Sequence, residues 1–291
     1  MNNPLNGIFS SLPRTVVVTG TDTDVGKTYA TAALAVAGWH TGYRRIAVYK
    51  PQQTGMRGDD PGDVHDVARL ARAAGVPSEA LTMAEGQRLT EPMAPPPAAA
   101  IDGVELLPIT AHMAKILELQ ESHDLVLVEG SGGVLVELDA DRHTIADLAV
   151  ALQGVASAPA EGGAGVPRVP RTVQGQAYTD EARGLPVPAG AASEGGVFRG
   201  ADPRAGRADA PVSTVLVARP DLGTLNHTLL SLEALQHRGV AVAGVVLGSW
   251  PTEPDRLHTS NREYLADLPA LDGRRIPLLG AVPQGWGHGS R

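Results

Sequence analysis

A lysine and a threonine follow a short polar loop near the start of the chain, and this order of residues is suited to binding phosphate. The apolar run TVVVTG at 15–20 leads into TDTDVGKT at 21–28, and an alanine-rich helical pattern follows. Backbone N–H groups in such a strand-to-helix turn, together with the positive end of the helix dipole, attract an anion. Lys27 could then reach the β- and γ-phosphates of a nucleotide, and the Thr28 hydroxyl could bind Mg²⁺. The alternative is an ordinary turn with a surface lysine, which the order of strand, loop, G-K-T and helix disfavours.

The spacing of this loop differs by one residue from the common phosphate-binding pattern, G-x-x-x-x-G-K-[ST]. That pattern would place its first glycine at Thr21, and the glycine of this sequence, Gly20, comes one position earlier. The extra residue is either a chance departure or the mark of a variant loop that belongs to a particular class of enzyme.

Three further charged residues stand where strands end or helices begin. Lys50 ends the run RIAVYK, and Pro51 after it favours an extended backbone, although a solvated lysine would fit equally well. Glu129 ends the run DLVLVEG, where a carboxylate is costly unless it is paired or bound to a metal, and this is the position of a Walker-B-type carboxylate. Asp63, in GDDPGDVHD, is either a helix N-cap or a metal ligand. Ligands bind beyond the carboxyl ends of parallel strands, so we expect Lys50 beside the phosphate loop.

A glycine-threonine turn in the stretch PDLGTLNHTLL opens another helical pattern after an apolar run. The N-terminus of that helix could hold a carboxylate or a phosphate. Simple capping by Thr224 or Asn226 is the alternative, and His227 is better suited to packing or capping than to acid–base chemistry.

The chain that must position these residues alternates between short apolar runs and helical patterns. The apolar runs lie at 15–20, 45–50, 124–130, 212–218, 240–248 and 276–282, and the helical patterns lie at 28–40, 63–75, 108–121, 144–152 and 224–239. Continuous rather than alternating apolar runs are typical of strands buried on both faces of a parallel sheet. We therefore predict an α/β fold, a single P-loop NTPase-like domain with a mostly parallel central sheet flanked by helices on both faces.

The domain boundaries follow from where these patterns stop. We expect an N-terminal tail at 1–14 and one P-loop domain at 15–291, interrupted at 154–211 by a stretch dominated by Gly, Ala, Pro and Arg. That stretch has too few apolar side chains to offset the entropy lost on ordering, so we predict a disordered insertion. The proline-rich stretch at 93–100 is predicted to be a stiff loop that could line a site.

Composition excludes several classes of protein. The net charge is −8 and Lys and Arg form no basic stripe, which argues against nucleic acid or an anionic membrane as the partner. The chain has no cysteine, so disulfides and thiolate chemistry are excluded. No signal-peptide pattern precedes the first strand, and the apolar runs are too short to span a membrane. We expect a cytoplasmic protein.

Four motifs in this order resemble the dethiobiotin synthetase family. They are the loop GTDTDVGKT at 20–28, the segment KPQQTG at 50–55, the segment VEGSGG at 128–133 and the segment LGTLNH at 222–227. The first motif includes the extra loop residue. The stretch PLLGAVP at 277–283 is similar to the family's last strand and the loop beside the base. The resemblance covers about 15–152 and 212–285.

The resemblance implies a homodimer of P-loop subunits that uses ATP, Mg²⁺ and CO₂ to close a ureido ring on 7,8-diaminopelargonate. One amine would take up CO₂ from the CO₂/bicarbonate pool, ATP would phosphorylate the carbamate, and the second amine would displace phosphate. Because the carbamate and the triphosphate are both anions, Lys27, Lys50 and Mg²⁺ would screen their repulsion.

The same resemblance implies a role for each motif residue. Catalysis would depend on Lys27, Lys50 and Thr54. The nucleotide would contact Thr23, Asp24, Val25, Gly26, Lys27, Thr28, Ser249 and Pro283. Thr28, Asp63 and Glu129 would hold the metal. The substrate would contact Lys50, Thr54 and Gly132 at its reacting end, and Leu222, Gly223, Thr224 and Asn226 at its distal carboxylate, across the dimer interface.

Two departures from the family pattern matter. Ser131 replaces the usual alanine, for which we expect little effect, and Gly248, Ser249 and Trp250 stand where many relatives have an Asn-Asp pair that reads adenine. The second departure puts selectivity for the adenine base in question.

Rival functions remain for the same fold. A partition or septum-positioning switch ATPase would carry a lysine where this loop has Thr21. A glutamine-dependent amidating enzyme would need a cysteine nucleophile, which this chain lacks. A nucleotide-binding regulator that uses the insertion is a third, non-catalytic alternative.

Overall fold

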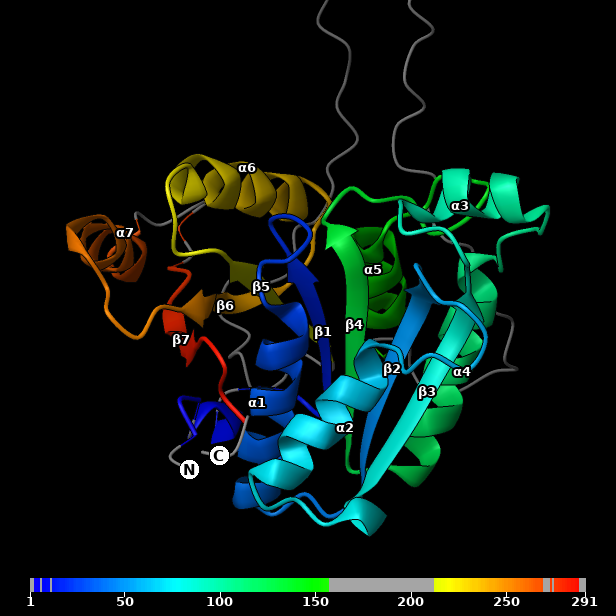
Figure 1. Ribbon diagram of the computed structural model, residues 1–291, viewed down its shortest axis with the longest axis horizontal. Coiled ribbons are helices and arrows are strands. Elements are labelled where there is room, and N and C mark those ends of the chain that lie inside the picture. The colour runs from blue at the N-terminus through cyan, green and yellow to red at the C-terminus, as the bar shows by residue number, and fades with distance from the viewer. Residues whose placement is uncertain are drawn as a thin grey trace, which may run out of the picture.

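The computed structural model describes residues 3–5, 7–10, 12–156, 212–268, 273 and 275–287. Most of the predicted insertion, 157–211, lies outside these described residues. The described chain forms one central sheet with helices on both faces (Figure 1).

The sheet has seven strands in the order β3-β2-β4-β1-β5-β6-β7, and every neighbouring pair is parallel. The strands are β1 (Thr15–Gly20), β2 (Ile46–Gln53), β3 (Leu81–Arg88), β4 (Leu125–Gly133), β5 (Ser213–Ala218), β6 (Val242–Trp250) and β7 (Leu278–Pro283). The predicted α/β class and its parallel sheet are therefore confirmed. All residues of β1, β2 and β5 are buried, which is why their sequences are apolar without alternation.

The helices cover the sheet in two layers. They are α1 (Lys27–Thr41), α2 (Asp63–Ala73), α3 (Pro95–Asp102), α4 (Ile109–Ser122), α5 (Ile145–Ala156), α6 (Thr224–His237) and α7 (Arg256–Ala266). Helices α1 and α2 pack on one face, and α4, α5, α6 and α7 pack on the other (Figure 1). Within the described chain, no helix is both long enough and apolar enough to cross a membrane.

Strand β3 and helices α3 and α7 were absent from the sequence prediction. Strand β3 lies at the sheet edge beside β2, and most of its residues are only half buried, so LTMAEGQR lacks the apolar run of a central strand. Helix α7 buries only Asn261 and Leu265, which leaves little helical periodicity, although Asp255 and His258 form a capping box at its start.

Helix α3 corrects the prediction of a loop at 93–100. Its prolines fall in the first turn, where a missing N–H costs nothing, and Gly103 ends the helix in a left-handed conformation. The segment therefore becomes helical where the prolines suggested a stiff, irregular chain.

The segment that precedes β1 packs against the domain. Leu5, Ile8, Phe9 and Leu12 are buried in the core on the α1 face, and the Asn3 side-chain amide donates to the carbonyl of Ala33 at 3.0 Å. Residues 154–156 of the predicted insertion continue α5. The predicted domain limits and the character of 157–211 stay predictions.

Candidate active site

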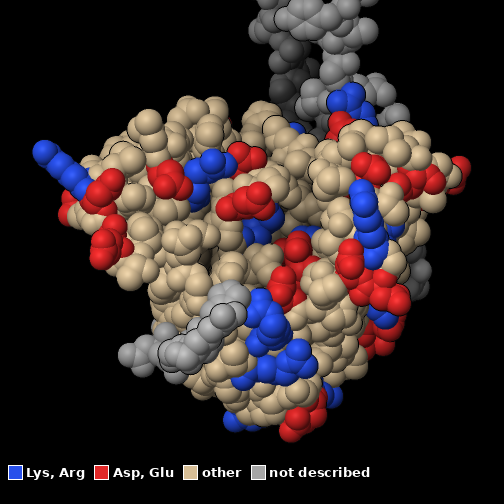
Figure 2. Space-filling model, in the orientation of Figure 1, with Lys and Arg blue, Asp and Glu red and all other residues tan. Residues whose placement is uncertain are grey.

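The carboxyl ends of β1, β2 and β4 open into one cavity of about 650 Å³. Figure 2 shows a hollow in this part of the surface, where acidic and basic side chains lie close together. Eleven of the predicted site residues line the cavity: Thr23, Asp24, Gly26, Lys27, Thr28, Lys50, Thr54, Asp63, Glu129, Gly132 and Ser249. The structure thus brings together residues from three of the four family motifs, together with Asp63 and Ser249, at the carboxyl ends of parallel strands.

The phosphate loop runs from the end of β1 to the start of α1. Asp24 and Gly26 both have positive φ, at 56° and 92°, and Gly26 is the N-cap residue of α1 without any side-chain cap. The first N–H groups of α1 therefore face the cavity without a capping side chain, as an anion site needs. The ammonium of Lys27 donates to the carbonyl of Asp22 at 2.9 Å, and the Asp22 carboxylate pairs with Arg219 at 2.5 Å.

Burial lowers the pKa of Lys27 to about 8, an effect that the nearby Lys50 strengthens and the Glu129 carboxylate opposes. In the free protein, Lys27 therefore loses its proton in the mildly alkaline range. A bound phosphate would favour the charged form and restore the proton.

We expect the number of protons taken up on nucleotide binding to increase as the pH rises through the pKa of Lys27. ADP is to be titrated calorimetrically in two buffers of different ionisation enthalpy, near neutral pH and about one unit above that pKa. Proton uptake should be small at the lower pH and approach one proton per site at the higher pH. Lys27→Arg is the control, since its guanidinium stays charged at both pH values. Equal uptake at both pH values in the wild-type protein would contradict a cationic role for Lys27.

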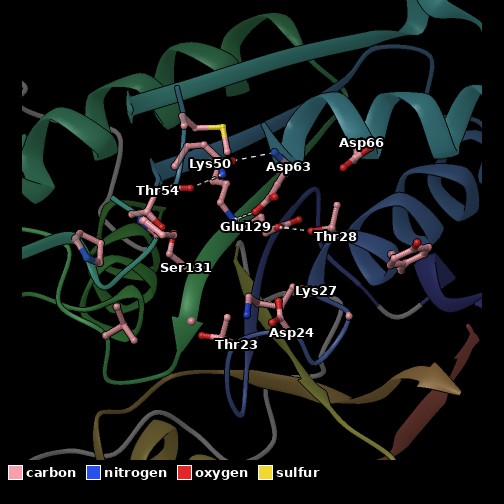
Figure 3. Close-up of a pocket in the computed structure, with 18 of the residues that line it drawn as sticks. Thr23, Asp24, Lys27, Thr28, Lys50, Thr54, Asp63, Asp66, Glu129 and Ser131 are labelled. Atoms are coloured by element: carbon pink, nitrogen blue, oxygen red, sulfur yellow. Dashed lines mark hydrogen bonds and ion pairs between the residues drawn. The ribbon is translucent and has the colours of Figure 1, made fainter. Parts of the chain in front are cut away.

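Lys50 lies between two carboxylates in the interior of the cavity (Figure 3). Its ammonium is 2.6 Å from the Asp63 carboxylate and 3.1 Å from Glu129, and the Thr28 hydroxyl donates to the same Glu129 oxygen at 3.1 Å. The side chains of Lys50 and Glu129 are 4% and 1% exposed. Strand β2 continues three residues past Lys50 to Gln53, so Lys50 is buried inside the strand instead of ending it.

The charge of Lys50 is maintained by these neighbours. Burial alone would lower its pKa, but Glu129 and Asp63 together raise it above the ordinary value. Lys50 is therefore held in its charged form in this site.

Asp63 is the first residue of α2, and the N-cap residue is Gly62. Of the two roles predicted for Asp63, the N-cap is therefore wrong, because its carboxylate contacts Lys50 instead of the helix N–H groups.

The oxygen ligands around Lys50 fit a magnesium ion. Thr28, Asp63 and Glu129 supply a hydroxyl and two carboxylates, and the second oxygen of Glu129 is buried without a hydrogen-bond partner among the described residues. Mg²⁺ is commonly bound by one or two carboxylates together with substrate phosphates and water. The described chain has no cluster of three or more His, Cys, Asp or Glu side chains that could hold a metal by itself. A magnesium site here would therefore be completed by the nucleotide.

Small residues after β4 shape the opposite wall of the cavity. Gly132 has a φ of 63°, and a Cβ there would lie 2.8 Å from Val136, so this position favours glycine over any residue with a side chain. The Ser131 hydroxyl donates to the backbone carbonyl of Gln52, which joins the end of β4 to β2. Figure 3 shows Ser131 and Thr54 near each other on the side of the cavity away from the phosphate loop.

The end of β6 packs directly beneath the phosphate loop. A Cβ on Gly248 would lie 1.9 Å from the carbonyl oxygen of Val25, and a Cβ on Gly26 would lie 3.0 Å from the Ser249 hydroxyl. Ser249 lines the cavity and has a φ of 51°, which a non-glycine residue rarely adopts. Gly248 and Ser249, which depart from the family pattern, therefore pack against the phosphate loop and support it from the side of β6.

Six predicted site residues are not among those that line this cavity. Val25, itself a residue of the phosphate loop, is fully buried, and Pro283 lies at the end of β7, where it pairs with Trp250. The remaining four are at the start of α6: Leu222, Gly223, Thr224 and Asn226. The N-cap residue of α6 is Gly223, and neither Thr224 nor Asn226 caps the helix with its side chain.

The cavity is also lined by residues that were not predicted as site residues: Tyr29, Gln53, Met56, Asp66, Arg69, Leu70, Pro92, Ser131 and Val136. Asp66 pairs with Arg69 at 2.8 Å on α2. The proline-rich stretch was expected to line a site, and part of it does so.

A parallel sheet whose first strand runs through a G-K-T loop into a helix defines a P-loop nucleotide-binding protein. A family model described as an AAA domain matches residues 14–154 and 205–285. The chain is 38% identical over 274 residues to the ATP-dependent dethiobiotin synthetase BioD of Rhodococcus erythropolis, covering 94% of this chain and 90% of that relative. It is 37% identical over 272 residues to the protein of the same name from Streptomyces coelicolor, covering 94% of this chain and 84% of the relative. The chain therefore belongs to the ATP-dependent dethiobiotin synthetase family.

Among solved structures, the BceF Tyrosine Kinase Domain is 17% identical with a TM-score of 0.40, and the match covers 80% of this chain and 67% of that one. This likeness is too distant to add to the assignment.

Proposed function

We propose that this chain is a dethiobiotin synthetase that closes the ureido ring of dethiobiotin on 7,8-diaminopelargonate, with CO₂, ATP and Mg²⁺. Family membership supports this proposal. The observation that carries it is the group of Lys50, Asp63, Glu129 and Thr28 beside the phosphate loop, in which Lys50 and Glu129 are buried. This group puts a fixed cation and oxygen ligands at the point where two anions must meet.

The reaction proceeds in three steps. One substrate amine adds to CO₂ and loses a proton, which gives a carbamate. A carbamate oxygen attacks the γ-phosphorus of ATP, the bond from that phosphorus to the bridging oxygen breaks, and ADP leaves. The second amine then attacks the carbamoyl carbon and loses a proton, and inorganic phosphate leaves as the ring closes.

The residues of the cavity bind and orient the two anions. The N–H groups of the loop and Lys27 bind the triphosphate, and Thr23 and Asp24 shape the loop around it. Lys50 stabilises the negative charge between the carbamate and the γ-phosphate. Thr28, Asp63 and Glu129 would hold Mg²⁺, which would neutralise charge on the phosphate oxygens. Since the chemistry needs mainly positioning, no side-chain nucleophile is required.

The reacting end of the diamine lies against Thr54 and Gly132, which line the cavity next to Lys50. The distal carboxylate lies at the start of α6, where Gly223 leaves the helix N-terminus without a side-chain cap and Leu222 is 80% exposed. Because these residues do not line the cavity of their own subunit, a second copy would present them, and we propose a homodimer. We place Ser249 and the chain around Pro283 on the side of the nucleotide base. We also propose that the protein acts in the cytoplasm.

We expect phosphate release from ATP only when diaminopelargonate, bicarbonate and Mg²⁺ are all present. Phosphate is to be assayed with each component omitted in turn. Turnover without the diamine would favour a switch ATPase or a regulator, and no turnover by folded protein with all components would refute the enzyme.

A further inference from the structure

The start of α2 has no side-chain cap of its own. Its N-cap residue, Gly62, cannot supply one, although the first N–H groups of a helix need partners. The N–H of Asp63 instead donates to the side-chain oxygen of Gln53, at 2.9 Å. That partner comes from β2, three residues after Lys50, so the helix start is tied to the strand that carries the cation.

The loop before α2 is held by an arginine from β3. The guanidinium of Arg88 donates to the backbone carbonyl of Asp60 at 2.8 Å and to that of Gly58 at 3.3 Å. Its Nε donates to the Glu85 carboxylate at 2.5 Å. Only the branched, planar guanidinium can reach three acceptors in this way.

The carboxylate of Glu85 lies against the first turn of α2. A Cβ added to Gly62 would be 2.2 Å from one Glu85 oxygen and 2.9 Å from the Gln53 side-chain oxygen, so a larger residue there would displace both side-chain ends. That Glu85 oxygen is buried without a hydrogen-bond partner among the described residues, and His65 is 3.9 Å away. A negative charge at this place is favoured by the helix dipole.

Pairing between β2 and β3 links this cluster to the active site. Glu85 is in register with Lys50, and Arg88 is in register with Gln53. The three side chains therefore fix the start of α2 relative to Lys50, and Asp63 is the residue at that start.

We propose that Gln53, Glu85 and Arg88 form a positioning cluster that holds the Asp63 carboxylate where it can share a magnesium–nucleotide complex with Thr28 and Glu129. This proposal rests on the metal role given to Asp63 in the proposed function. Removing the cluster would leave the phosphate loop intact but let the start of α2 move. The loss of nucleotide affinity should therefore appear only when Mg²⁺ is present.

Arg88→Ala tests the cluster through binding alone. The affinity of full-length protein for a non-hydrolysable ATP analogue is to be measured by calorimetry with and without Mg²⁺. We expect the gain in affinity that Mg²⁺ confers to fall about tenfold, as for other residues that orient metal ligands, while the affinity without Mg²⁺ changes less than about twofold. Arg88→Lys should restore only part of the gain, because an ammonium cannot make the three contacts together.

Lys115→Ala is the matched control, because it breaks an exposed ion pair with Glu118 on α4 and does not line the cavity. An unchanged gain from Mg²⁺ in Arg88→Ala, or an equal loss with and without Mg²⁺, would overturn the positioning role. If Arg88→Ala does not fold, Gln53→Ala removes the acceptor for the Asp63 N–H, together with a 3.4 Å hydrogen bond to the Thr54 carbonyl, and the same fall in the gain from Mg²⁺ is expected. A wild-type protein that gains no affinity from Mg²⁺ would instead overturn the metal role itself.

Discussion

Lys50→Ala is expected to lower turnover by about 10²–10³-fold while leaving ADP affinity nearly unchanged, the magnitude typical for loss of one preorganised charge-stabilising group. Lys50 is buried, contacts Asp63 and Glu129 and lines the cavity beside Thr54. The phosphate loop, by contrast, is proposed to bind the nucleotide independently of Lys50. The measurement is phosphate release at saturating diamine, bicarbonate and Mg²⁺, with ADP binding measured in parallel.

The same substitution should also lower stability, because it leaves the buried Glu129 carboxylate without its cation. Breaking a buried ion pair in this way costs about 3–5 kcal/mol. Lys50→Met fills the same space with an apolar chain and serves as the second variant if Lys50→Ala unfolds. Full turnover in either folded variant would remove Lys50 from the chemistry, and loss of ADP binding would move its role to the nucleotide.

Gly248→Ala is expected to weaken nucleotide binding by tenfold or more. The new methyl group would lie 1.9 Å from the backbone carbonyl oxygen of Val25, and a backbone atom cannot turn aside as the end of a side chain can. Overpacking of this kind costs about 1–3 kcal/mol, and about 1.4 kcal/mol is a tenfold change in affinity. Since the loop must shift to relieve the contact, the loss should appear in ADP affinity, measured by calorimetry.

Gly154→Ala is the control for Gly248→Ala. Gly154 lies in α5 with nothing within 4 Å of the added Cβ, so alanine there should leave ADP affinity unchanged and favour the helix. Equal ADP affinity in Gly248→Ala and the wild-type protein would mean that the support of the phosphate loop by β6 does not matter for binding.

The sequence predicted those parts of the fold and site that have a strong local pattern. Strands buried on both faces have continuous apolar sequences. Lys50 and Glu129 each follow the apolar part of such a strand and lie inside it, and the phosphate loop follows β1. Since parallel strands bring their carboxyl ends together, the convergence of these residues could be expected before the structure was known.

The rest could not be predicted because its pattern is weak or its partners are distant in sequence. Strand β3 is half buried and polar, so it lacks an apolar run, yet it supplies Glu85 and Arg88. Gln53 is a neutral amide in no motif, and only the fold shows that it meets the N–H of Asp63. The place of Asp63 beside Lys50 depends on the path of the loop before α2, which follows from contacts to β3 that the sequence does not reveal.

The most direct test of ring closure is to identify the product formed from labelled bicarbonate. The protein is to be incubated with diaminopelargonate, ATP, Mg²⁺ and ¹³C-bicarbonate, and the product is to be analysed by mass spectrometry alongside a phosphate assay. The account predicts a cyclic urea that carries one labelled carbon, with one phosphate released per ring closed. Phosphate release without labelled cyclic product would contradict this account. The absence of phosphate release by folded protein that binds ATP would also contradict it.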